Sequence, residues 1–222
     1  MAYNHGIKTS QQATSVSTPV VTASGIPIVV GTAPVHTVGG KANELVLANS
    51  YSEAVSALGY SDDWDKYTLC EMIYSQFMLY GMSPVIFVNV LDSSKHKKDV
   101  AATEMTISDG IIELPYEALK DTVVVSSAAS GGTSYTENED YSVYYGDTAL
   151  IIEINEDGAM KSAANAFVSY SAIDTSAVTK TDIIGGYNIT SGKNTGLELV
   201  EDCYAKFQII PDIILAPGYS SD

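Results

Sequence analysis

Three continuous apolar segments stand out along the chain, at residues 26–33, 85–90 and 211–216. Runs of four to eight apolar residues without alternation are typical of strands that are covered on both faces. The first of these runs ends at Pro34, which cannot donate a backbone hydrogen bond to a neighbouring strand. We therefore expect three buried strands, two near the start of the chain and one at its end.

Helical spacing separates these strands. Ser50 and Glu53 have the spacing of a capping box ahead of a short helix, and Gly59 is placed to end it. A longer helix is expected at residues 65–80, and a third is expected to begin with a second capping box, Thr195 and Glu198. The apolar stripe of the long helix is Leu69, Ile73, Phe77 and Tyr80, and that of the third is Leu197, Val200, Tyr204 and Phe207. Strands that alternate with helices predict an α/β core with a largely parallel sheet.

The pattern changes in the middle of the chain, where helical periodicity gives way to short alternating runs separated by turns. Asp109-Gly110 and Asp157-Gly158 are pairs that accept the positive φ angles of tight hairpin turns. Strands are expected at residues 106–108, 111–114, 122–126, 141–145, 149–154 and 166–170. This region predicts an antiparallel β-sandwich or barrel inserted into the α/β core.

Residues 1–24 are rich in Ser, Thr and Gln and show no helical period. Four β-branched residues, Ile7, Val16, Val20 and Val21, are enough for an extended strand but too few to bury it without another surface. A frayed terminus is one interpretation of this segment. A strand-donating arm is the other, with these four residues as its candidate contacts between subunits.

Charge and cysteine content narrow the possible partners. The chain holds 27 acidic against 11 basic residues, a formal net charge of -16, so most of its surface would repel DNA. The one basic concentration is at Lys95, His96, Lys97 and Lys98, which we interpret as a solvated linker. Cys70 and Cys203 lie in apolar helical patterns and are expected to be small buried hydrophobic residues in a reducing cytoplasm. No secretory signal or membrane span is expected.

The segments that resemble phosphate-binding or calcium-binding motifs lack required residues at the required spacing. Gly-Gly-Lys and Ser-Gly-Lys turns at residues 39–41 and 191–193 lack the remainder of a phosphate loop. The run 153–158 imitates half of a calcium loop, yet its twelfth position is Ala164 rather than Glu. The acidic groups at 62–65 and 137–140 are explained by a helix N-terminus and a solvated loop. We expect no metal, no cofactor and no enzymatic activity.

Three segments carry a resemblance to a known family. LGYSDDWDKYTLCEMIYSQFMLYGMSPVIFVNVLD at 58–92, GIPIVVGTAPVH at 25–36 and PDIILAPGYSSD at 211–222 resemble the tail sheath proteins of contractile phage tails and tailocins. The resemblance implies an extended N-terminal arm at 1–24, an α/β core at 25–98 and 181–222, and an inserted β domain at 99–180. It also implies that the core continues beyond Asp222, so that its sheet is incomplete at the C-terminus of this chain.

The family resemblance implies a function as well. A sheath subunit polymerises helically around a tail tube through strand exchange and contracts to drive the tube through a cell envelope. Its implied partners are other copies of itself, the tail tube protein, and baseplate and terminator components, in a virion tail or tailocin particle assembled in the host cytoplasm. No nucleic acid or membrane partner is implied. A ligand- or surface-binding module on the inserted β domain is the alternative.

Sheath cores are described as subtilisin-like, so the resemblance raises the question whether the chain holds the catalytic residues of a serine protease. Gly132-Thr133-Ser134 is similar to a subtilase nucleophile segment but lies in the loop-rich β region. His5, His36 and His96 fall in the arm, at a strand exit and in the linker. We therefore expect the fold to be shared without the protease activity.

Overall fold

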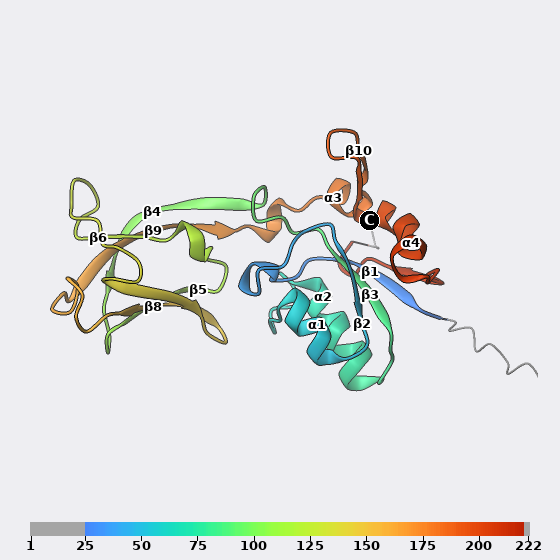
Figure 1. Cartoon of the computed structure of the whole chain (residues 1–222), viewed down its shortest axis with the longest axis horizontal. Helices are drawn as coiled ribbons and strands as arrows, with labels where there is room; N and C mark the ends of the chain where they lie inside the picture. The colour runs from blue at the N-terminus through green and yellow to red at the C-terminus, as the bar shows by residue number, and fades with distance from the viewer. Residues whose placement is uncertain (1–24, 220–222) are drawn as a thin grey trace, which may run out of the picture.

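The computed structural model describes residues 25–219 and shows a mixed α/β protein with several sheets. Figure 1 shows an elongated molecule with the helices and a mixed sheet at one end and two antiparallel sheets at the other. The long strands β4 (Lys97–Thr106) and β9 (Asn165–Ile173) run side by side between the two ends. We call the two ends the α/β region and the β region.

The sheet of the α/β region has the strand order β12-β1-β3-β2. Its bounds are β1 (Pro27–Gly31), β2 (Leu45–Ala48), β3 (Val85–Asn89) and β12 (Ile213–Leu215). β1 pairs in parallel with β3 and with β12, whereas β2 is antiparallel to β3. The predicted strands at 26–33 and 85–90 are thus confirmed, and the sheet is partly parallel as expected. β2 was missed, because its four residues carry too little pattern to separate them from a loop.

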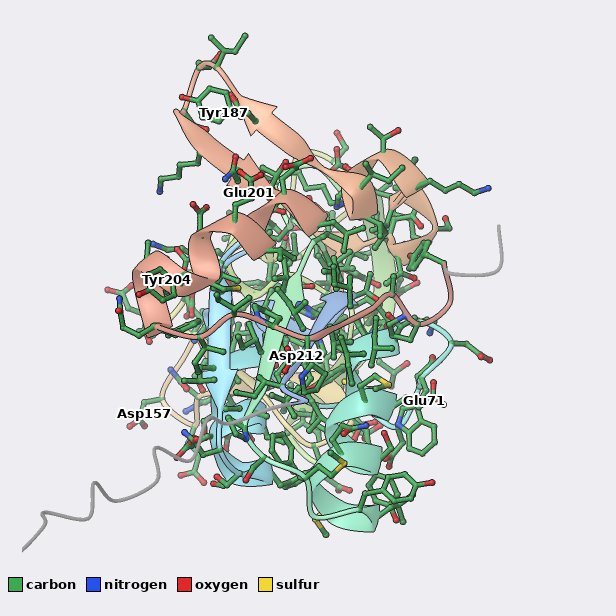
Figure 2. The ribbon with its side chains drawn as sticks, turned by 90° about the vertical axis from the view of Figure 1, so that its right-hand side faces the viewer. Glu71, Asp157, Tyr187, Glu201, Tyr204 and Asp212 are labelled. Carbon is green, nitrogen blue, oxygen red and sulfur yellow. The ribbon has the colours of Figure 1, made fainter. Side chains whose placement is uncertain are left out.

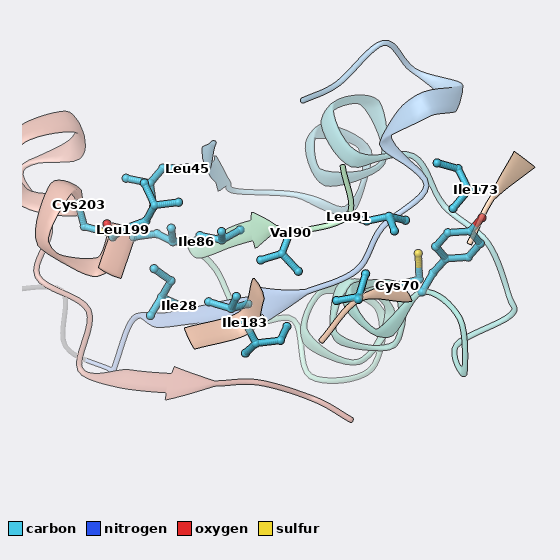
Figure 3. Packing of buried hydrophobic residues seen from close by; sticks show 14 of the residues in the cluster. Ile28, Leu45, Cys70, Ile86, Val90, Leu91, Ile173, Ile183, Leu199 and Cys203 are labelled. Atoms are coloured by element: carbon cyan, nitrogen blue, oxygen red, sulfur yellow. The ribbon is translucent and has the colours of Figure 1, made fainter. Parts of the chain in front are cut away.

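Consecutive residues of the two central strands belong to different cores. Ile28 and Ile86 lie in one buried cluster, and Val29 and Phe87 lie in another on the opposite face of the sheet. Helices α1 (Tyr51–Leu58) and α2 (Thr68–Ile73) cover the second face, together with the π-helix η2 (Tyr74–Leu79). The first face packs against Ile183, Leu199 and Cys203 from the C-terminal helices (Figure 3). Burial on both faces is the reason why the two strands are uninterrupted apolar runs.

Half of the first predicted capping box is present: Ser50 caps the helix, but Glu53 bonds to Asn49 rather than to the Ser50 backbone. Ser50 Oγ accepts a hydrogen bond from the Glu53 backbone N–H at 3.3 Å, and the Glu53 carboxylate accepts one from the Asn49 backbone N–H at 2.8 Å. α1 ends at Gly59, whose φ of 74° lies in the region that favours glycine. A cap at each end fixes this two-turn helix beside the sheet.

The long helix expected at residues 65–80 differs from the prediction in both its start and its winding. It begins at Thr68, and from Tyr74 onward it continues as a π-helix. The wider winding of a π-helix moves later side chains off the stripe that α-helical spacing predicts. Leu69 and Ile73 are fully buried as expected, but Tyr80 is 71% exposed, so its assignment to the core was wrong.

The third helix also differs. Thr195 makes no capping bond; its hydroxyl donates instead to the Gly186 carbonyl at 3.0 Å, so this capping box was wrong. A 3₁₀ helix, η5 (Gly196–Asp202), precedes the short α4 (Cys203–Phe207). Because a 3₁₀ helix has three residues per turn, Leu199 and Cys203 are buried in place of Tyr204, which is 57% exposed.

The remaining helices and strands of the α/β region are short. A capping box formed by Thr179 and Asp182, which the sequence reading missed, begins α3. An antiparallel hairpin follows α3 and projects from the molecule (Figure 1). The bounds are α3 (Lys180–Ile184), β10 (Gly186–Asn188), β11 (Lys193–Thr195) and the 3₁₀ turns η1 (Val35–Thr37), η3 (Lys120–Thr122) and η4 (Thr175–Ala177).

The β region consists of two three-stranded antiparallel sheets, β4-β9-β6 and β5-β8-β7, around one buried cluster. Its further strands are β5 (Ile111–Pro115), β6 (Val124–Ser126), β7 (Tyr141–Tyr145) and β8 (Ala149–Ile154). The antiparallel strands were predicted, but no closed barrel exists within residues 25–219, so that alternative was wrong. Asp109 and Gly110 have the expected positive φ angles, 52° and 78°, and the backbones of Ser108 and Ile111 exchange two hydrogen bonds of 3.0 Å, so the two-residue turn is confirmed. The strands on either side pair with each other no further, because β4 pairs with β9 and β5 with β8. This turn therefore leads from one sheet to the other.

Candidate assembly surfaces

The edge strand β12 is the most exposed part of the α/β sheet. The run 211–216 was expected to be buried, but Ile213 is 44% and Ile214 55% exposed, so that expectation was wrong. Ile210, at 71%, adds to this apolar surface, and the neighbouring Tyr204 and Asp212 are visible in Figure 2. No strand among residues 25–219 pairs with the outer side of β12. An unpaired sheet edge of this kind accepts an added strand through its backbone groups.

The predicted arm contacts Ile7, Val16, Val20 and Val21 lie outside the described residues. The structure therefore does not place them against β12 or any other edge. On the described side, the Gly25 backbone N–H donates to the Asp212 carboxylate at 2.6 Å. This bond places residue 25, where the arm segment meets the core, beside the start of the exposed edge strand.

A row of aromatic rings joins the two regions. His36 of the α/β region lies 6.1 Å from Tyr116 and 5.7 Å from Tyr145, measured between ring centroids, and both contacts are edge-on. The rings of Tyr116 and Tyr145 are themselves 6.1 Å apart at 74°. Edge-to-face packing at these distances is attractive beyond the area it buries. We call these three side chains the ring junction.

Hydrogen bonds fix each ring of the junction. The Tyr145 hydroxyl donates to the Ala118 carbonyl at 2.8 Å and accepts from the Lys120 backbone N–H at 3.2 Å. The Tyr116 hydroxyl donates to the Tyr60 carbonyl at 3.1 Å, across the boundary between the regions. The His36 Nε2–H donates to the Tyr116 carbonyl at 3.0 Å, which places the proton on that nitrogen. Sequence reading missed the junction, because these tyrosines carry no spacing signal.

Burial makes this junction sensitive to protonation. His36 Nδ1 is buried and has no hydrogen-bond partner among residues 25–219. The same is true of the Tyr67 hydroxyl, and the Tyr67 ring centroid lies 6.5 Å from that of His36. Burial lowers the pKa of His36 from its ordinary value of 6.5, against smaller opposing effects of the Tyr116 carbonyl and the Glu117 charge. Burial likewise raises the pKa of Tyr145 to about 12. The ring junction is therefore built from neutral groups.

An ion network lies beside the rings. Lys66 Nζ is 2.7 Å from a Glu117 carboxylate oxygen and 2.9 Å from one of Asp63. Hydrogen bonds to Glu117 and Asp63 raise the pKa of Lys66 to about 12. Burial alone would raise the pKa of Glu117, but the Lys66 hydrogen bond, a backbone N–H and the Lys66 charge together hold it below its ordinary value. The ion pair between Lys66 of the α/β region and Glu117 of the β region is thus a second contact that holds the two regions together.

The basic run at 95–98 lies where the chain passes from the α/β region into the β region, and we call this place the neck. Its three lysines are exposed, as expected of a solvated linker, but His96 is not. His96 is only 5% exposed, and its Nδ1 accepts from the Asp92 backbone N–H at 3.0 Å. Its backbone carbonyl accepts from the Asp174 N–H at 2.9 Å, which joins the strand that enters the β region to the one that leaves it. The His96 Nε2 lies 3.6 Å from Asp182 of α3. Lys97 and Lys98 are the first residues of β4.

The candidate catalytic residues stay apart. Ser134 lies in an exposed loop and forms a β-bridge with Ser126, whereas His36 and His96 lie at the junction and the neck. Within residues 25–219, no three His, Cys, Asp or Glu side chains are grouped so that they could hold a metal ion. None of the described helices has the length and apolar character required to cross a membrane. Cys70 and Cys203 are free and fully buried, as expected.

The described residues form a mixed α/β protein of two joined regions, whose edge strand β12 can accept an added strand from the remainder of its own protein or from another copy. The comparison with known proteins gives the particular class. The chain is 29% identical over 219 residues to the tail sheath protein of Burkholderia phage BcepMu. The match covers 98% of this chain and 43% of that protein, so the chain spans less than half the length of the relative. No protein-family model matches. The resemblance to tail sheath proteins is thereby confirmed.

Proposed function

We propose that this chain is part of a structural subunit of a contractile tail sheath, which polymerises helically around a tail tube. The similarity to a phage tail sheath protein over nearly the whole chain carries this proposal. Its partners are further copies of itself, the tube protein, and baseplate and terminator components, in a virion tail or a tailocin. The comparison does not support the alternative of a ligand-binding module on the β region.

The organisation we propose keeps the boundaries expected from the sequence: an arm at 1–24, a core formed by 25–98 and 181–222, and an inserted domain at 99–180. In this proposal, assembly occurs by strand addition at the edge of β12, where Ile213 and Ile214 are exposed; residues of the same protein beyond 222 are the competing occupant of that edge. In this proposal, Ile7, Val16, Val20 and Val21 of one copy line the strand that is added to a neighbour. Backbone hydrogen bonds then hold the copies together while the subunits shift as rigid bodies during contraction.

Electron microscopy tests this function. We would express the full-length natural protein that contains this sequence and examine it by negative stain, beside a variant in which Val16, Val20 and Val21 are each changed to Lys. We expect helical tubes from the natural protein and monomers of unchanged melting temperature from the variant. The matched control changes three exposed residues of the β region that line neither of the two charged clefts between the regions, Thr103, Thr106 and Val124, to Lys and should still form tubes. Monomers from the natural protein at every salt concentration would refute the proposal.

A further inference from the structure

A cavity between the two regions carries positive charge that no described salt bridge pairs. It has a volume of about 680 Å³ and is lined by η1 and the loop after it, the turn before β4, η3 and the end of β7. Lys97 and Lys120 both line it, and neither forms a salt bridge within residues 25–219. Asp121 is the one acidic residue of its lining. We call this cavity the lysine cleft.

A cleft with positive charge is unexpected in a chain that is acidic as a whole. Acidic residues outnumber basic ones by 27 to 11, so identical copies repel one another unless charges pair locally at their contacts. Two ammonium groups in one cleft form a surface suited to carboxylates. The occupant is therefore expected to be acidic, and the chain itself is the most abundant acidic surface in a homopolymer.

A second cleft of opposite charge lies at the same junction. It has a volume of about 490 Å³, and Asp62, Asp63, Glu117 and Asp147 line it with Lys66 as the one basic residue. Its rim is the turn at 62–65, in which Asp62 and Asp65 are exposed. Trp64, 37% exposed, lies between them with its ring 5.6 Å from that of Tyr74. A tryptophan flanked by carboxylates, on a turn held by the Asp63–Lys66 ion pair, is a preorganised contact surface.

The two clefts are separated by the ring junction. The lysine cleft contains His36 and Tyr145, the acidic cleft contains Tyr67 and Tyr116, and no residue lines both. Both combine residues of the two regions, so both lie at the junction between them. A neighbour placed alongside in the same orientation can therefore bring its acidic rim to the lysine cleft. A contact between two different surfaces of identical subunits repeats from copy to copy and generates an open helix.

We propose that the lysine cleft binds the turn at 62–65 of a second copy of this chain, with Asp62 and Asp65 facing Lys97 and Lys120 and Trp64 as the central apolar contact. This inference rests on the proposed function, because it requires a polymer of identical subunits. It adds a lateral charge-paired contact to the strand addition at β12.

Charge reversal in the full-length protein tests the contact. Lys97→Glu with Lys120→Glu should raise the concentration for half-maximal assembly about tenfold, and so should Asp62→Lys with Asp65→Lys, because attractive pairs become like charges. All four changes in one chain restore opposite charges across the contact and should return assembly to within about threefold of the natural protein. The control, Lys161→Glu with Lys193→Glu, makes the same change of charge at exposed positions outside both clefts and should assemble normally.

Three outcomes would overturn the proposal. Normal assembly of both reversed variants refutes this contact and leaves the proposed function intact. Loss of assembly with the lysine changes alone, without rescue by the four-fold variant, shows that another acidic partner occupies the cleft. Failure of the natural protein itself to assemble refutes the proposed function, and this contact with it.

Disulfide trapping gives a second readout that does not depend on the stability of Lys120 variants. A chain with Lys97→Cys and Asp65→Cys should form covalent ladders under mild oxidation, because the two positions meet between copies. The natural Cys70 and Cys203 are fully buried and give a low background. A chain with Lys161→Cys and Asp65→Cys is the matched control. Ladders of equal yield from the two chains would contradict the proposal.

Discussion

Removing one hydroxyl from the ring junction should measurably weaken the fold. Tyr145→Phe keeps the ring but removes the group that donates to the Ala118 carbonyl and accepts from the Lys120 N–H. Ala118 is fully buried, so its carbonyl is left without this donor, whereas Lys120 lines an open cleft where water can replace the lost acceptor. A buried carbonyl left without its donor costs about 1–3 kcal/mol, so we expect a loss of about 2 kcal/mol in the free energy of unfolding.

Urea unfolding, followed by tyrosine fluorescence and far-ultraviolet circular dichroism, measures this loss. With an m value of about 2–3 kcal/mol/M for a chain of this size, the midpoint should fall by roughly 0.7–1 M. Tyr144→Phe is the matched control, because the neighbouring hydroxyl belongs to a side chain that is 45% exposed. It should leave the midpoint unchanged. Equal midpoints for the two variants would refute the view that the Tyr145 hydroxyl ties the β region to its own η3 turn and the junction.

Three further predictions concern pH, capping and salt. The pKa of His36 is lowered from 6.5 in the folded chain, so below this pH the unfolded chain binds a proton that the folded chain does not bind. The free energy of unfolding therefore falls as the pH drops below 6.5, until the pH reaches the lower pKa of the folded chain. His36→Gln should therefore lose less melting temperature between pH 7 and pH 5 than the natural chain; an equal loss would contradict this role. Ser50→Ala should lower the free energy of unfolding by about 1 kcal/mol, because it removes the bond to the Glu53 N–H, while Ser52→Ala, exposed within the same helix, should not lower it in the same urea assay. Assembly of the full-length protein, followed by light scattering, should weaken at low ionic strength, because this part of each copy carries a formal net charge of -16 and the charge pairs at the lysine cleft leave most of it unpaired when screening is poor; constant assembly between about 20 and about 150 mM salt would contradict this.

Sequence patterns predicted the strands that are buried on both faces along their whole length. They failed for the strand at the sheet edge and for the helices whose winding changes partway. β1 and β3 are buried on both faces, so each is an uninterrupted apolar run that can be identified without a structure. β12 has a similar composition but lies at the sheet edge, and composition does not distinguish an edge strand from a central one. The winding of the helices could not be predicted from sequence either. The π-helix that begins at Tyr74 and the 3₁₀ helix that begins at Gly196 turn other residues toward the core than α-helical spacing predicts, and their composition gives no sign of this.

The candidate surfaces were less accessible from sequence than the fold. The lysine cleft combines Lys97 and Lys120 with His36, from three separate parts of the chain, and only the tertiary fold brings them together. The ring junction has the same character, because its three rings are distant in sequence and share no periodic spacing. The acidic turn at 62–65 was visible as a motif, but its interpretation as a helix N-terminus was incomplete, because α2 begins only at Thr68.

The neck of the molecule has a consequence for how such a chain can vary. The hydrogen bond between the His96 carbonyl and the Asp174 N–H brings the two ends of the β region next to each other. A segment whose ends meet in space can be exchanged, lengthened or removed without moving the remainder of the chain. A short loop from residue 96 to residue 174 would keep the helices that cover the α/β sheet, but it would remove Leu119 and Ile173 from the core cluster and expose His36. A domain exchanged at this point must therefore replace the contacts of Tyr116 and Tyr145 as well as the two ends of the segment.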